Sequence, residues 1–407
     1  MPLPPKTAVF VFMPQSLEIA QKGDVSFAPV DYEPILSQTE SFGARARDLW
    51  FKKLAEAAEY AHDAAFVYTG IGGAPGGNKN IEVTGFGDRS IVAPCLDLEA
   101  TLGRIPKILL LPASPLTADH ILNLSGLART YKEQGVKKVV VLLTSLAHER
   151  QDHVFPGADG KPRLQVTTLK DVMEQLSLHC DAGILVQPHS LRSIELGLRY
   201  EFPLLPIDPF KFMMHHINVK NYQNGFSLGP DKGRKDEGRM AAAWLGWPMG
   251  SAMKTRDREH GGKPKITIPP EVLTYIQAHN CTVFVYDDEV REGGTIGALA
   301  AALDGYAKEM IVAAVKPIFA SNGEKSAVEH LAHPLISRVI ITDAIRPLTD
   351  VAPIAHKLEV IPLEPDIRAI AEYLQGHLVE PNNSDWLRNS QETGTLLRLD
   401  LSIERIG

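Results

Sequence analysis

The chain of 407 residues has few cysteines, no excess of basic residues and no long apolar run. Its three cysteines, Cys95, Cys180 and Cys281, are odd in number and widely spaced, which favours reduced thiols over disulfides or a zinc site. No run reaches the roughly 18 apolar residues that a membrane span needs. The first residues also lack a basic stretch followed by an apolar one. We therefore expect a cytoplasmic protein with no membrane anchor.

The charge balance excludes further classes of function. Lys and Arg number 42 against 49 Asp and Glu, and the net charge is -7. Dedicated binders of nucleic acid or anionic membranes normally carry an excess of Lys and Arg, so neither partner is expected. Apolar residues make up 44% and charged residues 22%, as in globular proteins, and the length favours two domains.

Apolar runs alternate with segments of helical periodicity, the pattern of an α/β fold. Residues 107–112 predict a strand, residues 117–134 a helix that ends at Gly135, and residues 139–143 the next strand. The same order returns over residues 282–315. We therefore expect two similar domains, each with a mainly parallel sheet flanked by helices. Further strands are predicted at residues 183–186, 339–342 and 358–362, and further helices at residues 168–176 and 365–374.

Prolines suggest where one domain ends. Pro203, Pro206 and Pro209 are expected to interrupt any regular element over residues 202–210. The predicted domains are therefore residues 1–205, with an N-terminal elaboration, and residues 206–379. Residues 380–407 form a C-terminal tail.

A predicted strand leads two adjacent carboxylates, Asp287 and Asp288, into a turn with Gly293, Gly294 and Thr295 that begins a helix. Backbone amides at a helix start favour an anion, and glycines let a phosphate approach closely. The carboxylates are suited to ribose hydroxyls or to magnesium. An acidic turn capped by glycine would have the same pattern, so this segment alone does not decide between the two.

The segment resembles the sugar diphosphate loop of the phosphoribosyltransferase fold. Five further segments resemble the ribose-phosphate pyrophosphokinase family in the order in which that family has them, and together they cover about residues 80–375. In chain order they are Gly85-Phe86-Gly87-Asp88, Ser145 to Asp152 with Arg150 and Gln151, Gln187-Pro188-His189 followed by Gly229-Pro230-Asp231, and Met253-Lys254-Thr255-Arg256.

This resemblance implies transfer of a diphosphoryl group from ATP to the anomeric hydroxyl of a ribose phosphate. It implies that Phe86, Asp88, Arg150 and Gln151 bind ATP, that His189 and Asp231 serve Mg²⁺, and that Lys254 and Arg256 are catalytic residues on a closing loop. It further implies that Asp287, Asp288, Arg291, Gly293, Gly294 and Thr295 bind the ribose phosphate. A homo-oligomer, either a dimer or a hexamer, is expected.

Three positions depart from the family pattern. Gln187 stands where the family has an acid, Ser90 stands in place of a glutamate, and Arg291-Glu292 replaces an Asp-Thr pair. A carboxylate that faces a phosphate dianion is unfavourable. Either Arg291 turns in to hold the phosphate of ribose 5-phosphate, or the acceptor carries a less charged 5-substituent, as in ADP-ribose.

Two other classes of function stay open. A phosphoribosyltransferase would use residues 287–295 and leave the other segments without a role, and a non-catalytic regulatory relative would explain the departures at Gln187, Ser90 and Glu292. Residues 68–77, Tyr-Thr-Gly-Ile-Gly-Gly-Ala-Pro-Gly-Gly, imitate a dinucleotide-binding loop. We interpret them as an ordinary loop, because Pro75 falls where the helix would run.

Overall fold

The computed structural model describes the chain in two units. It describes residues 49, 53, 64–66, 71, 84–85, 91–92, 95–151, 167–207, 209, 213–214, 217, 222, 224–230, 235–255, 265–321, 323 and 325–363. The described residues up to 209 belong to the first unit, and those from 213 to 361 belong to the second.

The first unit is built on a parallel sheet of five strands in the order β1-β4-β5-β6-β7. Its strands are β1 (Ala64–Phe66), β4 (Ile108–Ala113), β5 (Lys138–Leu143), β6 (Ala182–Val186) and β7 (Leu204–Ile207). Its helices are α2 (Leu98–Leu102), α3 (Ala118–Glu133), α4 (Thr168–Ser177) and α5 (Leu191–Arg199), and a small hairpin joins β2 (Thr84–Gly85) to β3 (Ile91–Val92).

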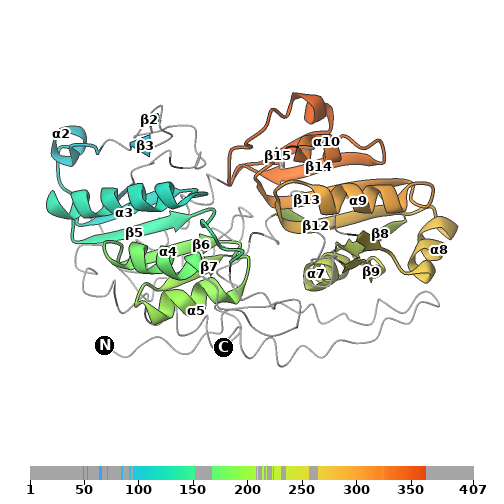
Figure 1. Ribbon diagram of the computed structural model, residues 1–407, viewed down its shortest axis with the longest axis horizontal. Coiled ribbons are helices and arrows are strands. Elements are labelled where there is room, and N and C mark those ends of the chain that lie inside the picture. The colour runs from blue at the N-terminus through green and yellow to red at the C-terminus, as the bar shows by residue number, and fades with distance from the viewer. Residues whose placement is uncertain are drawn as a thin grey trace, which may run out of the picture. The chain divides into compact units, whose positions relative to one another are not determined.

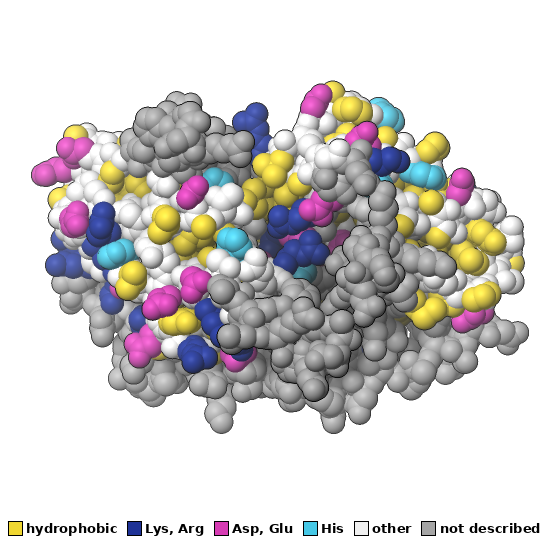
Figure 2. Space-filling view, in the orientation of Figure 1, with side chains coloured by type: hydrophobic (Ala, Val, Ile, Leu, Met, Phe, Trp, Pro, Cys, Tyr) yellow, Lys and Arg dark blue, Asp and Glu magenta, His cyan; other side chains and the backbone are white. Residues whose placement is uncertain are grey.

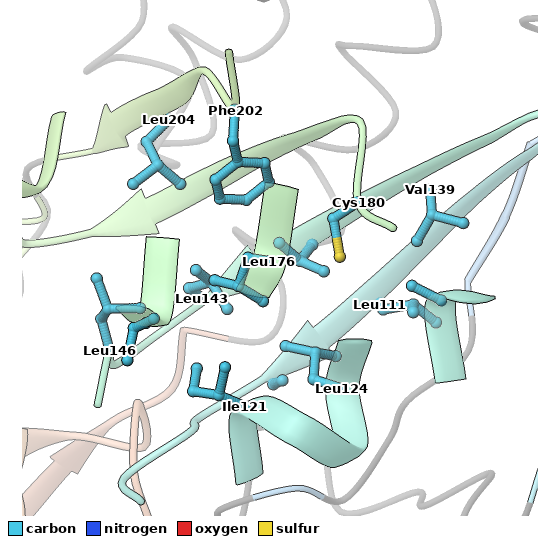
Figure 3. Packing of buried hydrophobic residues seen from close by; sticks show 14 of the residues in the cluster. Leu111, Ile121, Leu124, Val139, Leu143, Leu146, Leu176, Cys180, Phe202 and Leu204 are labelled. Carbon is cyan, nitrogen blue, oxygen red and sulfur yellow. The ribbon is translucent and has the colours of Figure 1, made fainter. Parts of the chain in front are cut away.

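The buried apolar residues of this unit show why these segments form strands and helices. Every residue of β4 is buried, as expected for a central parallel strand covered on both faces. Leu111, Val139 and Leu143 meet Leu124 of α3 and Leu176 of α4 in one apolar cluster (Figure 3). The helix α3 begins where the Thr117 hydroxyl accepts a hydrogen bond from the His120 amide, and the chain turns away at Gly135, whose φ is 112°.

The prediction that the prolines of residues 202–210 interrupt all regular structure is wrong. Pro206 lies inside β7, which pairs with β6 and stands at the edge of the sheet. An edge strand can hold a proline because one side of it needs no ladder hydrogen bond. Since β7 continues to Ile207, the first sheet extends past the predicted boundary at residue 205.

The second unit has a parallel sheet of six strands in the order β15-β14-β13-β12-β8-β9 (Figure 1). The strands are β8 (Gly225–Gly229), β9 (Met249–Ser251), β12 (Thr282–Val290), β13 (Glu309–Pro317), β14 (Ile336–Thr342) and β15 (Leu358–Ile361). The helices are α7 (Lys235–Leu245), α8 (Pro270–Ala278), α9 (Gly294–Leu303) and α10 (Ala327–Leu331), with a 3₁₀ turn η5 (Ala352–Lys357). A separate antiparallel hairpin is formed by β10 (Met253–Thr255) and β11 (Lys265–Thr267).

The predicted α/β class with two mainly parallel sheets is confirmed. The predicted helix at residues 365–374 and the tail at 380–407 lie outside the described residues, as does most of the N-terminal elaboration. No helix within the described ranges is long and apolar enough to cross a membrane. On the face drawn in Figure 2, the described part of the surface carries both acidic and basic side chains.

Candidate functional site

The strand order of the second sheet reverses between β8 and β12. From β8 the chain moves outward to β9, returns through the hairpin β10-β11 and α8, and then continues in the opposite direction from β12 to β15. In open parallel sheets, ligands bind outside the carboxyl ends of the strands at such a reversal. The second sheet therefore has one topologically preferred site, at the carboxyl ends of β8 and β12.

At this point β12 is longer than its neighbour. Phe284 pairs with Ser227, and two more steps bring Tyr286 level with Gly229, where β8 ends. Residues Asp287 to Val290 continue past that end while they remain paired with β13 on the other side. The strand that carries the predicted aspartates thus projects beyond β8 at the reversal.

The two aspartates have different surroundings. Side chains alternate between the faces of a strand, so Asp287 and Asp288 point to opposite sides of the sheet. Asp288 is only 2% exposed, whereas Asp287 is half-buried. The Asp287 carboxylate accepts a hydrogen bond from the Asp288 amide (2.9 Å), and the Asp288 carboxylate accepts one from the Glu289 amide (2.8 Å). These local bonds orient both carboxylates.

The turn after β12 requires glycine at one position. Gly293 precedes α9 with a φ of 72°, and a Cβ there would lie 3.0 Å from the Ala327 Cα. At Gly294, the first residue of α9, a Cβ would meet nothing within 4 Å. A helix leaves its first amides without intrahelical acceptors, and these amides carry the positive end of the helix dipole. The start of α9, with Thr295 in its first turn, is therefore suited to an anion.

Arg291, the cation of this turn, is tied to the strand that precedes it. Its Nε lies 3.4 Å from Oε1 of Glu289, and the side chains of Arg291 and Glu289 are 35% and 10% exposed. The backbone of the turn is anchored on the segment after β13, because the Ala320 amide donates to the Arg291 carbonyl (2.8 Å) and the Phe319 amide to the Val290 carbonyl (3.0 Å). Arg291 therefore stands at the entrance of α9 in a defined position.

In the first unit, two of the predicted segments meet at the carboxyl edge of the sheet. Glu149 is 6% exposed, and its Oε1 accepts hydrogen bonds from the His189 amide (2.7 Å) and the Ser193 hydroxyl (3.1 Å). This buried carboxylate joins the loop after β5, which contains Arg150 and Gln151, to the start of α5. Gln151 also accepts a hydrogen bond from the Thr168 amide at the start of α4 (3.4 Å).

Gln187, two residues before His189, is strained and incompletely hydrogen-bonded. Its φ is 47°, a left-handed conformation unusual for a residue with a side chain. Its side chain is buried, and its Oε1 has no hydrogen-bond partner. Strain and an unpaired buried acceptor tend to occur where a ligand binds.

The chain resembles known proteins in sequence and in fold. No family model matches it. It is 26% identical over 194 residues to the ribose-phosphate pyrophosphokinase of Saccharolobus solfataricus, which covers 47% of this chain and 62% of that protein. It is 26% identical over 228 residues to the enzyme of the same name from Sulfurisphaera tokodaii, covering 56% and 72%. For the Aeropyrum pernix enzyme of that name the identity is 29% over 224 residues, covering 53% and 64%.

The chain is therefore similar in sequence to ribose-phosphate pyrophosphokinases. The crystal structure of phosphoribosylpyrophosphate synthetase from Mycobacterium smegmatis has the same fold, with a TM-score of 0.55, 18% identity, and coverage of 73% of this chain and 89% of that one. The chain spans about two thirds of the length of the related pyrophosphokinases, between 62% and 72% for the three above. Ribose-phosphate pyrophosphokinases are transferases.

Several residues predicted from the family resemblance lie outside the described part of the chain, namely Phe86, Asp88, Asp231 and Arg256. Lys254 is described only by its backbone, which lies in β10 opposite Ile266 of β11. The predicted catalytic loop therefore includes at least one strand of a hairpin. The roles of these residues stay predictions.

Glu149 in the first unit, and Glu289 and Lys316 of β13 in the second, were not predicted from the sequence as members of the candidate sites. The partners of Glu149, His189 and Ser193, lie 40 and 44 positions away in the sequence. Lys316 and Glu289 are brought level only by the register of two strands, so neither pairing can be seen in the sequence. One signal was available for Lys316: it is a charged residue at the end of the strongly apolar run Met310–Val315. A charge in such a run needs a partner.

Proposed function

We propose that the chain is a diphosphotransferase that moves the β,γ-diphosphoryl group of Mg-ATP to the anomeric hydroxyl of ribose 5-phosphate. The products would be phosphoribosyl diphosphate and AMP. The observation that carries this proposal is the arrangement at the strand reversal, where Asp287 and Asp288 stand next to the glycine-opened start of α9. Carboxylates for sugar hydroxyls and helix amides for a phosphate are the groups that a ribose phosphate needs.

In this mechanism the anomeric oxygen attacks the β-phosphorus in line. The bond from that oxygen to the β-phosphorus forms, the bond from the β-phosphorus to the oxygen shared with the α-phosphorus breaks, AMP leaves with the electron pair, and the hydroxyl proton is released to water. Positioning supplies much of the rate of such a reaction. Lys254 and Arg256 would stabilise the charge that develops on the transferred group and on the leaving AMP.

On the nucleotide side, Phe86 and Asp88 would bind the base, and Arg150 and Gln151 the rest of ATP. An arginine can bridge two phosphate oxygens with its planar fork. Glu149 supports this assignment indirectly, because it fastens the loop of Arg150 to the start of α5. The loop can then hold a ligand with little loss of conformational entropy.

Residues at the carboxyl edge of each sheet have the chemistry that Mg²⁺ needs. Mg²⁺ binds through oxygens and usually needs only one or two carboxylates besides substrate phosphates. Within the described ranges no group of three or more His, Cys, Asp or Glu side chains could hold a metal by itself. In the second unit Asp287 and Asp288 offer oxygens, and in the first unit the unpaired Oε1 of Gln187 offers one. His189 and Asp231 are assigned from the family resemblance. A bound Mg²⁺ would neutralise phosphate charge during the transfer.

The acceptor can be either of two sugars. Arg291 is anchored at the entrance of α9, which favours a 5-phosphate and therefore ribose 5-phosphate. Glu292 next to it favours a 5-substituent with less charge per phosphorus, such as ADP-ribose. The chemistry at the anomeric carbon is the same in both cases, so we keep ribose 5-phosphate as the first candidate and ADP-ribose as the second.

The test is to incubate the full chain with Mg-ATP and, in parallel, ribose 5-phosphate, ADP-ribose or no sugar. Mass spectrometry then follows AMP and the new sugar diphosphate. We expect AMP and one sugar diphosphate in equal amounts with one of the two sugars, and neither product without sugar. ADP as the only nucleotide product, or no nucleotide product with either sugar, would contradict the proposal.

Two other functions lead to different results in the same assay. A phosphoribosyltransferase would consume phosphoribosyl diphosphate with a base and would not form AMP from ATP. A non-catalytic regulatory relative would bind nucleotide without turnover, and the departures from the family pattern at Gln187, Ser90 and Glu292 favour it. We also propose a homo-oligomer, a dimer or a hexamer, which sedimentation would test.

A further inference from the structure

A lysine is buried in the second sheet, close to the proposed acceptor site. Lys316 lies in β13 and is 1% exposed. Among the residues that the structure describes, it is the only lysine or arginine in the buried core. An ammonium group removed from water is strongly unfavourable unless acidic groups lie next to it. Its position is therefore informative about the charges around it.

Strand register identifies those acidic groups. Glu289 of β12 is the register partner of Lys316, so the two side chains extend from the same face of the sheet. Asp287 lies on that face two residues earlier in β12. On the other side, Ala314 pairs with Ile341, and two more steps along both strands bring Lys316 level with Asp343, just after β14. Register thus places three acidic residues, Asp287, Glu289 and Asp343, on the same face as Lys316 and within two residues of its level at the carboxyl edge of the sheet.

Glu289 connects this buried cation to the turn. The Glu289 side chain is 10% exposed, and its Oε1 lies 3.4 Å from the Nε of Arg291 in the turn. Lys316 is the register partner of Glu289 on the neighbouring strand β13, so Glu289 has one cation in the turn and one on the next strand. Attraction from two cations on different sides holds a carboxylate in one position. The position of Arg291 at the entrance of α9 therefore depends on Glu289, and that of Glu289 on Lys316.

We infer that Lys316 is a positioning residue for acceptor binding: through Glu289 it holds Arg291 where the 5-phosphate, or the first phosphate of a 5-substituent, binds. Lys316 itself is too buried to touch the sugar. This inference rests on the proposed function for the identity of the ligand, and it adds the residue chain that sets acceptor affinity. It also explains why a charge is kept in an apolar strand.

The test compares Lys316→Met, Glu289→Gln and the double variant in the full chain. Calorimetry measures the Kd of ribose 5-phosphate, of ADP-ribose and of a non-hydrolysable ATP analogue. We expect Lys316→Met to raise the Kd of the sugar that wild type binds by roughly 10- to 100-fold, the scale of one charge-assisted hydrogen bond. The Kd of the ATP analogue should change less than about twofold, since the predicted ATP-binding residues lie in the first unit.

The double variant separates positioning from folding. Because it removes both charges together, its stability to denaturant should exceed that expected from the sum of the two single variants. Its sugar affinity should nevertheless stay low, since Arg291 has lost its anchor. If Lys316→Met fails to fold, the double variant alone decides, and wild-type sugar affinity in it would overturn the inference.

Lys357 provides a matched control. Its ammonium group donates to the carbonyls of His333 (3.2 Å) and Ile336 (2.9 Å) in the same unit. Lys357→Met should lower stability and leave the sugar Kd unchanged. Sugar affinity that is unchanged in Lys316→Met, or equally lost in Lys357→Met, would overturn the inference, as would a wild-type protein that binds neither sugar. A wild-type protein that binds sugar but forms no AMP would overturn the proposed function alone.

Discussion

The two parallel sheets differ in strand order, and that difference separates their proposed roles. The described strands of the first sheet follow one another in chain order, β1-β4-β5-β6-β7, so their order never reverses. The second sheet reverses between β8 and β12. A reversal opens a crevice because the connections leave in opposite directions. The two units share the alternation of strands and helices, but only the second sheet has a strand reversal at its carboxyl edge where a ligand can bind.

The carboxyl edges differ in how they are held together. In the first unit a buried carboxylate, Glu149, joins two loops by accepting hydrogen bonds from neutral donors. In the second unit charges of both signs, Lys316, Glu289 and Arg291, follow one another across two strands and a turn. The first arrangement stabilises loops that would hold ATP in the proposed function, and the second would place charge next to the proposed sugar phosphate.

The largest expected effect tests the hairpin β10-β11 of the second unit, whose Lys254 is proposed to be catalytic. Lys254→Ala should lower turnover by roughly 100- to 1,000-fold, the usual loss when a group that stabilises transition-state charge is removed. AMP release measures it, and circular dichroism checks the fold. Thr267→Ala, an exposed position in the same hairpin, serves as the control and should keep wild-type turnover. Undiminished AMP release by Lys254→Ala would refute its role.

A pair of variants tests the division of roles between the sheets. Asp287→Asn should raise the KM of the sugar roughly 10-fold or more and leave the KM of ATP unchanged, because the amide removes a charged acceptor of sugar hydroxyls. Glu149→Gln should do the reverse, with a KM for ATP raised about 10-fold. Initial rates with each substrate varied in turn give both constants. Parallel changes of both KM values in both variants would contradict the comparison.

Two adjacent glycines sharpen the description of the turn before α9. Gly293→Ala should lower the free energy of unfolding by about 1 to 3 kcal/mol, because φ is 72° and the new Cβ would press on Ala327. The Cβ added by Gly294→Ala would meet no atom within 4 Å, so the free energy of unfolding should change by less than about 0.5 kcal/mol. Urea unfolding measures both. Equal stability losses would show that the turn has another conformation.

The smallest effect concerns one buried thiol in each unit. Burial raises the pKa of Cys180 to about 12 and that of Cys281 to about 11, from 9.0. The folded state therefore keeps a proton that the unfolded state loses, so the stability contribution is complete below pH 9 and declines as the pH rises toward the folded pKa. At pH 10 the ionisation of each thiol in the unfolded state should lower the free energy of unfolding by roughly 1 kcal/mol relative to its value well below pH 9.

Denaturation of wild type, Cys180→Ala and Cys281→Ala at pH 8 and pH 10 checks this expectation. Each variant should lose less stability than wild type between the two pH values, and the effect of Cys180 should appear in the transition of the first unit. A stability that is the same at both pH values would contradict the burial of these thiols in solution.

The secondary structure could be predicted from the sequence because apolar periodicity and the residues that end helices and strands are local features. The apolar run at β4, the helical spacing of α3 and the glycine after it predicted those elements to within a few residues. The region of Pro206 was misread, since a proline's effect on a strand depends on whether the strand stands at the edge of a sheet. Edge position is a property of the sheet and has no local signal.

By itself the sequence determined the fold class, the family resemblance and the segment with Asp287, Asp288 and Gly293, because each of these depends on residue types at fixed short spacing. Tertiary structure alone decided the strand reversal, the contact of Glu149 with His189 and the alignment of Lys316 with Glu289. Such contacts join residues 27 to 40 positions apart, as for Lys316 with Glu289 and His189 with Glu149. They arise only when strands are ordered and set in register, and register depends on the packing of the whole sheet.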